Sequence, residues 1–158
     1  MQRSRTSTGD EPRIEPVKET NVDTLVDLAS LFRREEGHAL DEARERALRQ
    51  IASGEPLARA WLVRHNAQTL GYVIITFGFS VESGGRDGFI DEFFILPAAR
   101  GGGLGRGLLD FAMKRAAELG IRTLHLEVEI GNERAIRMYR AAGFQETGRR
   151  LMRLPLNP

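Results

Sequence analysis

Apolar residues change their spacing along the chain, and these changes mark the expected helices and strands. Between Val22 and Phe32 the apolar residues recur with the period of a helix that buries one face. The same period returns in three later segments. Asn21 and Asn132 stand at N-cap positions, and a glycine follows each helical segment as a stop. The pattern therefore predicts helices over residues 22–32, 41–52, 104–119 and 132–142.

The remaining apolar segments are rich in Val, Ile, Phe and Tyr, or alternate apolar with polar positions, as strands do. They predict strands over residues 13–17, 58–64, 69–80, 89–96, 123–130, 144–147 and 149–154. Residues 65–68 read as a hairpin turn, and residues 82–88 as a loop. With no internal repeat or linker, this order predicts one α/β domain whose mixed sheet has helices on both faces.

The composition narrows the function classes without selecting one. The chain has 158 residues, a net charge of +1 and no cysteine. We expect a polar, mobile tail over residues 1–12 and one domain over residues 13–156. The small net charge favours neither nucleic acid nor a membrane as partner, and the lack of cysteine excludes disulfides and an acyl-cysteine intermediate. With no signal peptide and no membrane-spanning stretch, we expect a cytoplasmic protein.

A glycine-rich turn between the strand at 89–96 and the following helix is the first candidate site. It has the sequence Arg100-Gly-Gly-Gly-Leu-Gly105. Exposed backbone N–H groups at a helix N-terminus favour an anion such as a diphosphate. The dinucleotide-binding spacing of glycines fails because Arg106, Leu108 and Asp110 occupy the last glycine position in the possible registers. A P-loop is excluded because no Gly-Lys pair occurs in the chain.

Two longer motifs resemble those of one enzyme family. Residues 93–105 resemble motif A of the GNAT acetyltransferases, with Arg100, Gly103 and Gly105 at the signature positions. Residues 126–144 resemble motif B, which has an Asn, an Ala three residues on, a Tyr seven on and Gly-Phe eleven on. The resemblance covers about 58–154. It implies a single-domain GNAT-like α/β fold, with a mixed, mostly antiparallel sheet of six to seven strands and helices on both faces.

The resemblance also implies a site for acetyl-CoA as co-substrate. The strand before the glycine turn would pair with the pantetheine amides, the glycine-turn amides would hold the pyrophosphate, and Asn132 would contact the pantetheine arm. The implied donor-site residues are Phe94, Ile95, Leu96, Arg100, Gly101, Gly102, Gly103, Leu104, Gly105, Arg106, Asn132 and Tyr139. We expect no metal, because the three histidines lack metal-ligand spacing.

Three residues are candidates for proton transfer. Tyr139 matches the family's general acid, which protonates the CoA thiolate. The acceptor amine must lose a proton, and Asp91 or Glu92 could take it, often through water. In a regular strand Glu92 shares a face with Ile90, and relatives pack the positions of Phe93 and Ile95 in the core, which would turn Glu92 toward the acceptor. A β-bulge would swap the faces, and polyamine acetyltransferases favour the position of Asp91, so both carboxylates stay candidates.

These residues predict an N-acetyltransferase that moves acetyl directly from acetyl-CoA to an amine. Two alternatives stay open: a non-catalytic CoA-binding or sensing module on the same fold, and an enzyme for protein amino groups. The acidic residues near the expected cleft favour a small cationic amine as acceptor. Because relatives are often dimers, the resemblance also favours a homodimer.

Overall fold

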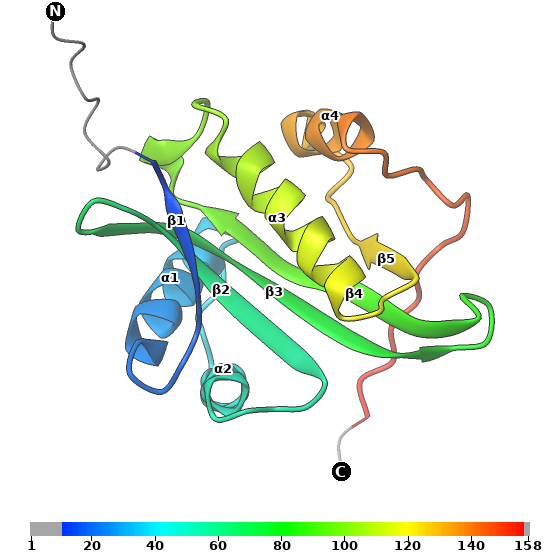
Figure 1. The fold of residues 1–158 in the computed structure, drawn as a ribbon, viewed down its shortest axis with the longest axis horizontal. Coiled ribbons are helices and arrows are strands. Elements are labelled where there is room, and N and C mark those ends of the chain that lie inside the picture. Colours follow the sequence, from blue (N-terminus) through cyan, green and yellow to red (C-terminus); the bar gives the residue numbers. More distant parts are fainter. Residues whose placement is uncertain (1–10, 157–158) are drawn as a thin grey trace, which may run out of the picture. The chain divides into compact units, whose positions relative to one another are not determined.

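The computed structural model describes residues 11–156 (Figure 1). Most of the predicted tail, residues 1–10, lies outside the described residues. Contacts divide the chain into two compact units that meet between Glu127 and Val128 in the sequence. The first unit contains a five-stranded sheet with three helices, and the second contains one helix. Each unit is described by itself below.

The elements of the first unit follow the predicted order. They are β1 (Arg13–Pro16), α1 (Val22–Glu35), α2 (Glu42–Ala52), β2 (Ala58–His65), β3 (Gln68–Ser80), β4 (Gly85–Ile95), a 3-10 turn (Pro97–Ala99), α3 (Leu104–Glu118) and β5 (Thr123–Leu126). The second unit holds α4 (Glu133–Ala141). Asp41 caps α2 as its Oδ1 accepts from the Arg44 N–H at 2.8 Å, while Asn21 precedes α1 without a side-chain cap.

The sheet has the strand order β1-β2-β3-β4-β5. The first three pairings are antiparallel, and β4 pairs with β5 in parallel across the α3 crossover. Figure 1 shows α1 and α2 on one face of this sheet and α3 on the other. The α/β class and the placement of helices on both faces are therefore confirmed, with five strands in the described residues rather than six to seven.

Apolar residues fill both faces of the sheet. On the α1/α2 face, Tyr72, Ile74 and Phe94 pack against Leu25 and Ala29 of α1. The rings of Phe94 and Phe32 lie 5.4 Å apart. On the α3 face, the rings of Trp61 and Phe111 meet edge to face at 5.7 Å. These two layers fix the sheet between its helices, so the side chains of β4 are held in place from both sides.

A β-bulge in β4 decides which way its polar residues face. Ile74 pairs with Glu92 and Ile75 pairs with Ile90, so Asp91 is an extra residue without a partner in β3. Ile90 therefore faces α3, whereas Glu92 and Phe94 face α1 and α2. The regular strand, with Ile90 and Glu92 on one face, was the wrong alternative. The core position of this segment on the α1 side belongs to Phe94 rather than to Phe93.

The C-terminal region departs most from the sequence prediction. The strand expected over 123–130 ends at Leu126, and the strands expected over 144–147 and 149–154 are absent from the described residues. The apolar side chains of the last segment, Leu151, Met152, Leu154 and Leu156, are exposed. An alternating pattern forms a strand only when an edge is available for pairing, and the pattern itself does not supply that edge.

Candidate active site

The glycine turn leads into α3 through two backbone conformations that favour glycine. Gly101 has φ of 99° and Gly103, the N-cap residue of α3, has φ of 86°. The first intrahelical bond runs from the Gly107 N–H to the Gly103 carbonyl. The N–H groups of the residues between them have no intrahelical acceptor, and they lie at the positive end of the helix dipole. The turn therefore offers the kind of backbone donors that a diphosphate needs, and its role as the pyrophosphate site stays a prediction.

Replacing Gly103 by alanine should weaken binding of acetyl-CoA by about tenfold. The added Cβ meets no atom within 4 Å, so the cost comes from the left-handed φ, which disfavours a side chain by about 1–2 kcal/mol. Isothermal titration measures the change. Gly107→Ala is the matched control, because Gly107 lies inside α3 without a left-handed φ and alanine there should leave affinity unchanged. Equal affinities of the two variants would contradict this role of Gly103.

The strand that enters the glycine turn pairs with β5 over only part of its length. β5 pairs with β4 only from Asp87 to Ile90, whereas β4 continues to Ile95. The Leu96 N–H donates to the Leu70 carbonyl at 2.8 Å, so Leu96 is bonded toward β3. By the alternation of an antiparallel ladder, the backbone groups of Phe93 and Ile95 point away from β3. This edge can pair with an extended amide chain, as the pantetheine arm of CoA would require.

The side chain of Arg100 lies along this edge. Its Nε donates to the Ile95 carbonyl at 2.9 Å, and its guanidinium pairs with Glu35 at the end of α1 at 2.8 Å. The guanidinium also lies 5.7 Å from the centre of the Phe94 ring. Arg106, the other predicted cation, bonds Asp110 within α3 at 2.9 Å. Arg100 thus connects the end of β4 to α1, in addition to standing at the glycine turn.

Glu92 is the most strongly held carboxylate of β4. Its Oε1 accepts from Arg33 of α1 at 2.8 Å, and its Oε2 accepts from the hydroxyl of Tyr72 at 2.8 Å. Burial raises the pKa of the Glu92 carboxyl, and the bonds from Tyr72 and Arg33 partly oppose that rise. Both oxygens are fixed, and the raised pKa makes the ionised form a stronger base than an exposed glutamate.

Asp91 has a different environment. It is the extra residue of the bulge, and its side chain is more exposed than that of Glu92. Desolvation by the surrounding protein still raises the pKa of its carboxyl, while the Arg33 guanidinium lowers it. The charge of Arg33 therefore acts on Asp91 as well as on Glu92, and both predicted carboxylates lie near this residue of α1.

Arg33 and Tyr72 were not among the predicted site residues. Arg33 donates to Glu36 as well as to Glu92, and its Nε is buried without a hydrogen-bond partner. Tyr72 is fully buried, and its pKa is raised by desolvation and by the neighbouring Glu92 charge, so its hydroxyl stays protonated. A basic residue in the last turn of α1 was the only sequence signal for Arg33, and such residues are common there.

The second unit carries the other two predicted residues. Asn132 is the N-cap of α4, and its Oδ1 accepts from the Ala135 N–H at 3.1 Å, as predicted. The Tyr139 ring packs edge to face against Phe144 at 5.9 Å. Burial raises the pKa of the Tyr139 hydroxyl to about 12. The hydroxyl is therefore protonated at neutral pH, as a general acid must be.

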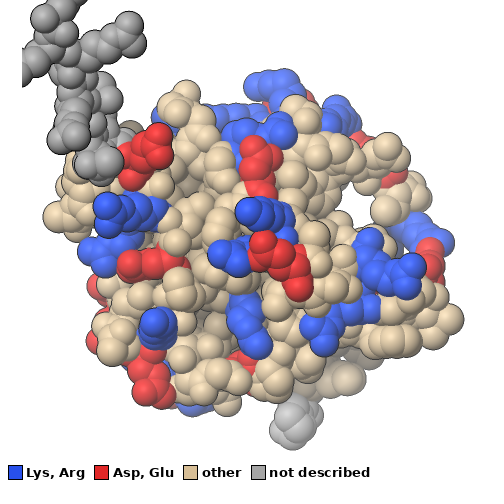
Figure 2. Space-filling view, viewed as in Figure 1, with Lys and Arg blue, Asp and Glu red and all other residues tan. Residues whose placement is uncertain are grey.

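Charged residues of both signs alternate over the surface. The face shown in Figure 2 has basic and acidic side chains next to each other, in keeping with the ion pairs Arg106–Asp110 and Arg115–Glu118 along α3. Within residues 11–156, no three His, Asp or Glu side chains come together as a metal would need. None of the helices described has the length and apolarity to span a membrane.

The family comparison agrees with these features. The model of the acetyltransferase (GNAT) family matches residues 25–144, which include β4, the glycine turn and α4. The chain belongs to the GNAT acetyltransferase family. This GNAT protein is an acyltransferase, and the resemblance of its two motifs is confirmed at the level of the family.

Individual relatives agree with the family assignment. The GNAT chain is 30% identical to the IAA acetyltransferase of Azospirillum brasilense over 77% of its own length and 71% of the relative. It is 33% identical to an aminoglycoside N(6')-acetyltransferase type 1 of Stenotrophomonas maltophilia over 45% of its length and 47% of the relative. An integron cassette protein from the mobile metagenome of Cole Harbour Salt Marsh has a TM-score of 0.81 and 37% identity, covering 92% of this chain and 91% of that one.

Proposed function

We propose that this GNAT protein transfers the acetyl group of acetyl-CoA directly to the amine of a small molecule. The observation that carries the proposal is the end of β4 beyond its pairing with β5, which leads into the glycine turn and has Glu92 on its α1/α2 face. A donor bound along this edge has its thioester near the strand that holds the base. The chain contains no cysteine, so direct transfer needs no acyl-cysteine.

The donor is held by backbone groups and by the glycine turn. The backbone at the end of β4 pairs with the amides of the pantetheine arm, and the N–H groups at the start of α3 bind the pyrophosphate. Asn132 hydrogen-bonds the pantetheine arm while it also caps α4. The Ile95 carbonyl already accepts from Arg100, so binding of the donor requires Arg100 to share or release this oxygen.

Two proton transfers accompany acetyl transfer. Glu92 takes a proton from the acceptor ammonium through a water molecule, and the neutral amine then attacks the thioester carbonyl carbon. A C–N bond forms, the C–S bond breaks, and Tyr139 donates its proton to the leaving thiolate. Glu92 passes the first proton to solvent, and the nitrogen then loses its second proton by the same route. Tyr139 regains a proton from solvent, so one proton is released overall. Asp91 is the alternative base, since the Arg33 charge also acts on it.

Small amines are the acceptor class that the relatives support. The acetyltransferase of Stenotrophomonas maltophilia, by its name, acts on an aminoglycoside. Glu92 pairs with the Arg33 guanidinium, and the charges of Arg33 and Asp91 both act on it, so two carboxylates share the field of this guanidinium. A carboxylate pair of this kind attracts an ammonium group.

The test is a titration followed by an activity screen. Acetyl-CoA should bind with a Kd on the order of 10 µM, in the usual range for enzyme substrates. Release of CoA thiol should then require an amine, and a panel of polyamines, amino acids, aminoglycosides and basic peptides identifies the class. Absence of acetyl-CoA binding would refute the proposal. Binding without thiol release for any amine would instead identify a CoA-sensing module.

A further inference from the structure

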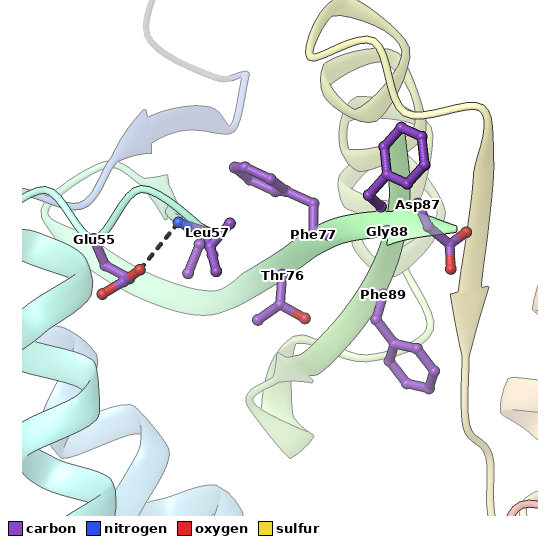
Figure 3. Close-up of a pocket in the computed structure, with 10 residues that line it drawn as sticks. Glu55, Leu57, Thr76, Phe77, Asp87, Gly88 and Phe89 are labelled. Atoms are coloured by element: carbon purple, nitrogen blue, oxygen red, sulfur yellow. Dashed lines mark hydrogen bonds between the residues drawn. The ribbon is translucent and has the colours of Figure 1, made fainter. Parts of the chain in front are cut away.

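A pocket opens on the α1/α2 face of the sheet, next to the hairpin that joins β3 to β4. Its volume is about 420 Å³, and Figure 3 shows the side chains around it. Glu55, from the α2–β2 connection, lies at one end, and Asp87 of β4 lies at the other. Thr76 and Phe89 lie between them. Neither the family match nor the relatives' names refer to this pocket.

The strand register puts this pocket on the same face as Glu92. Thr76 pairs with Phe89, and Gly78 pairs with Asp87. Thr76 and Gly78 continue the alternation of Ile74, so they belong to the α1/α2 face. In Figure 3 Thr76 and Phe89 point to one side and Phe77 to the other.

The bulge extends this face along β4. Because Asp91 is an extra residue, Asp87, Phe89 and Glu92 all fall on the α1/α2 face. The four regular steps from Asp87 to Glu92 correspond to roughly 13 Å of strand. The pocket and the proposed base therefore lie on one surface of one strand, about the length of an extended small molecule apart.

The chemistry of the pocket suits a cation. Asp87 is fixed through its Oδ1, which accepts from Ser83 Oγ at 2.9 Å and contacts His125 Nε2 at 3.0 Å. Both of these contacts use Oδ1, so we expect Oδ2 to be the oxygen that meets a ligand. Phe89 stacks on His125 and adds an aromatic face beside the carboxylate. Arg59 donates to the Glu55 and Ala58 carbonyls at 2.7 Å and 2.6 Å. The Arg59 and Arg86 guanidinium groups lie over the ring of Phe77, which also lines the pocket but points to the opposite side of β3 from Thr76.

Gly78 keeps the floor of the pocket open. A Cβ built there meets no atom within 4 Å, and the residue has no left-handed φ. A larger side chain is therefore compatible with the strand and would fill the pocket. The Glu55 side chain accepts from the Leu57 N–H through Oε1 at 3.1 Å, and among residues 11–156 no further bond to this carboxylate is seen at its end of the pocket.

We propose that this pocket binds a second ammonium group of the acceptor, which makes the preferred acceptor a diamine or polyamine with its charges roughly 10–13 Å apart. The proposal rests on the proposed function, because it assigns the reacting amine to Glu92. The distal ammonium binds between the Asp87 and Glu55 carboxylates against Phe89. A monoamine of the same length lacks this contact and binds more weakly.

The test compares the α,ω-diamine of octane with octylamine, by thiol release and by direct titration of the protein loaded with CoA. The diamine should have at least a tenfold lower KM and a lower Kd. Gly78→Val and the double variant Glu55→Gln/Asp87→Asn should each raise its KM to that of octylamine, with kcat changed less than threefold. Glu118→Gln, which removes a carboxylate from the α3 side, is the control and should change neither constant.

The outcomes distinguish a failure of the pocket proposal from a failure of the proposed acetyl transfer. Equal KM values for diamine and monoamine in the native protein would overturn the pocket and leave the transferase intact. Diamine binding that Gly78→Val abolishes, without thiol release, would support the pocket and refute the transfer. A fall of several degrees in Tm for Gly78→Val would show that protein side chains of this chain or a second copy fill the pocket, which would also overturn the proposal.

Discussion

Replacing Glu92 by glutamine should lower kcat/KM about 10²–10³-fold, the effect expected when a positioned base is lost. Glutamine has nearly the same shape and can still contact Arg33 and Tyr72, so the core around Phe94 should remain packed. The amide cannot accept the ammonium proton. Steady-state kinetics with the best acceptor measure the loss, and titration with acetyl-CoA should show an unchanged Kd.

The pH dependence of kcat/KM is a second test of Glu92 as the base. Activity requires ionised Glu92, so kcat/KM falls as the pH drops through the Glu92 pKa. Burial raises that pKa, so the acid limb should lie above the ordinary glutamate value of 4.5. Removal of the Tyr72 hydroxyl in Tyr72→Phe deletes a bond that lowers this pKa, and the limb should move to higher pH.

Asp91→Asn is the matched variant, because it changes the neighbouring carboxylate of the same bulge. It should reduce kcat/KM by less than tenfold if Glu92 is the base. The opposite pattern, with Asp91→Asn inactive and Glu92→Gln within threefold of the native enzyme, would transfer the role to Asp91. If the acid limb of kcat/KM lies at the same pH in the native enzyme and in Tyr72→Phe, the residue that acts as base is not the one that Tyr72 contacts.

The local features of this fold could be predicted from the sequence because they depend on neighbouring residues. The predicted cap at Asn132 follows from a side chain that reaches backbone three residues away, whereas Asn21, also predicted as a cap, makes no side-chain bond to α1. The glycine turn follows from the conformations that only glycine adopts easily, at Gly101 and Gly103. The strand-turn-helix order around them then predicted the donor site without any knowledge of the sheet.

The partners of Glu92 could not be predicted, because they come from distant parts of the chain. Arg33 is 59 residues away and Tyr72 is 20 residues away. Which residue meets Glu92 depends on the β3–β4 register and on the position of α1 over the sheet. The bulge at Asp91 is a property of two paired strands, so the pattern of one strand leaves both faces open. The orientation of Glu92 therefore needed the structure.

At the C-terminus the sequence predicted strands that the structure does not form. Their apolar pattern suggested pairing, yet Leu151 and Leu154 are exposed in the structure. Strand propensity reports fit to a half-buried surface, and no β-sheet partner covers these residues within the described chain. The pocket between Glu55 and Asp87 could not be predicted for the same reason as the partners of Glu92. Its lining residues come from separate segments, the α2–β2 connection at Glu55 and β4 at Asp87.

Replacing Tyr139 by phenylalanine should lower kcat about 10²-fold and leave the Kd for acetyl-CoA nearly unchanged. Phenylalanine keeps the ring that packs against Phe144, so α4 should remain folded. The loss comes from the missing proton donor. It should be at the lower end of the range for general acids, because a thiol with a pKa near 8.5 is already a fair leaving group.

The pH profile separates this role from packing. The Tyr139 pKa is raised to about 12, so its hydroxyl stays protonated over the usual assay range and the loss in Tyr139→Phe should be constant from neutral to mildly alkaline pH. Phe144→Leu is the control, since it alters the ring contact and keeps the hydroxyl. Equal kcat for native enzyme and Tyr139→Phe across pH would remove Tyr139 from the mechanism. An equal loss in both variants would assign Tyr139 a packing role, and the leaving thiolate would then take its proton from water.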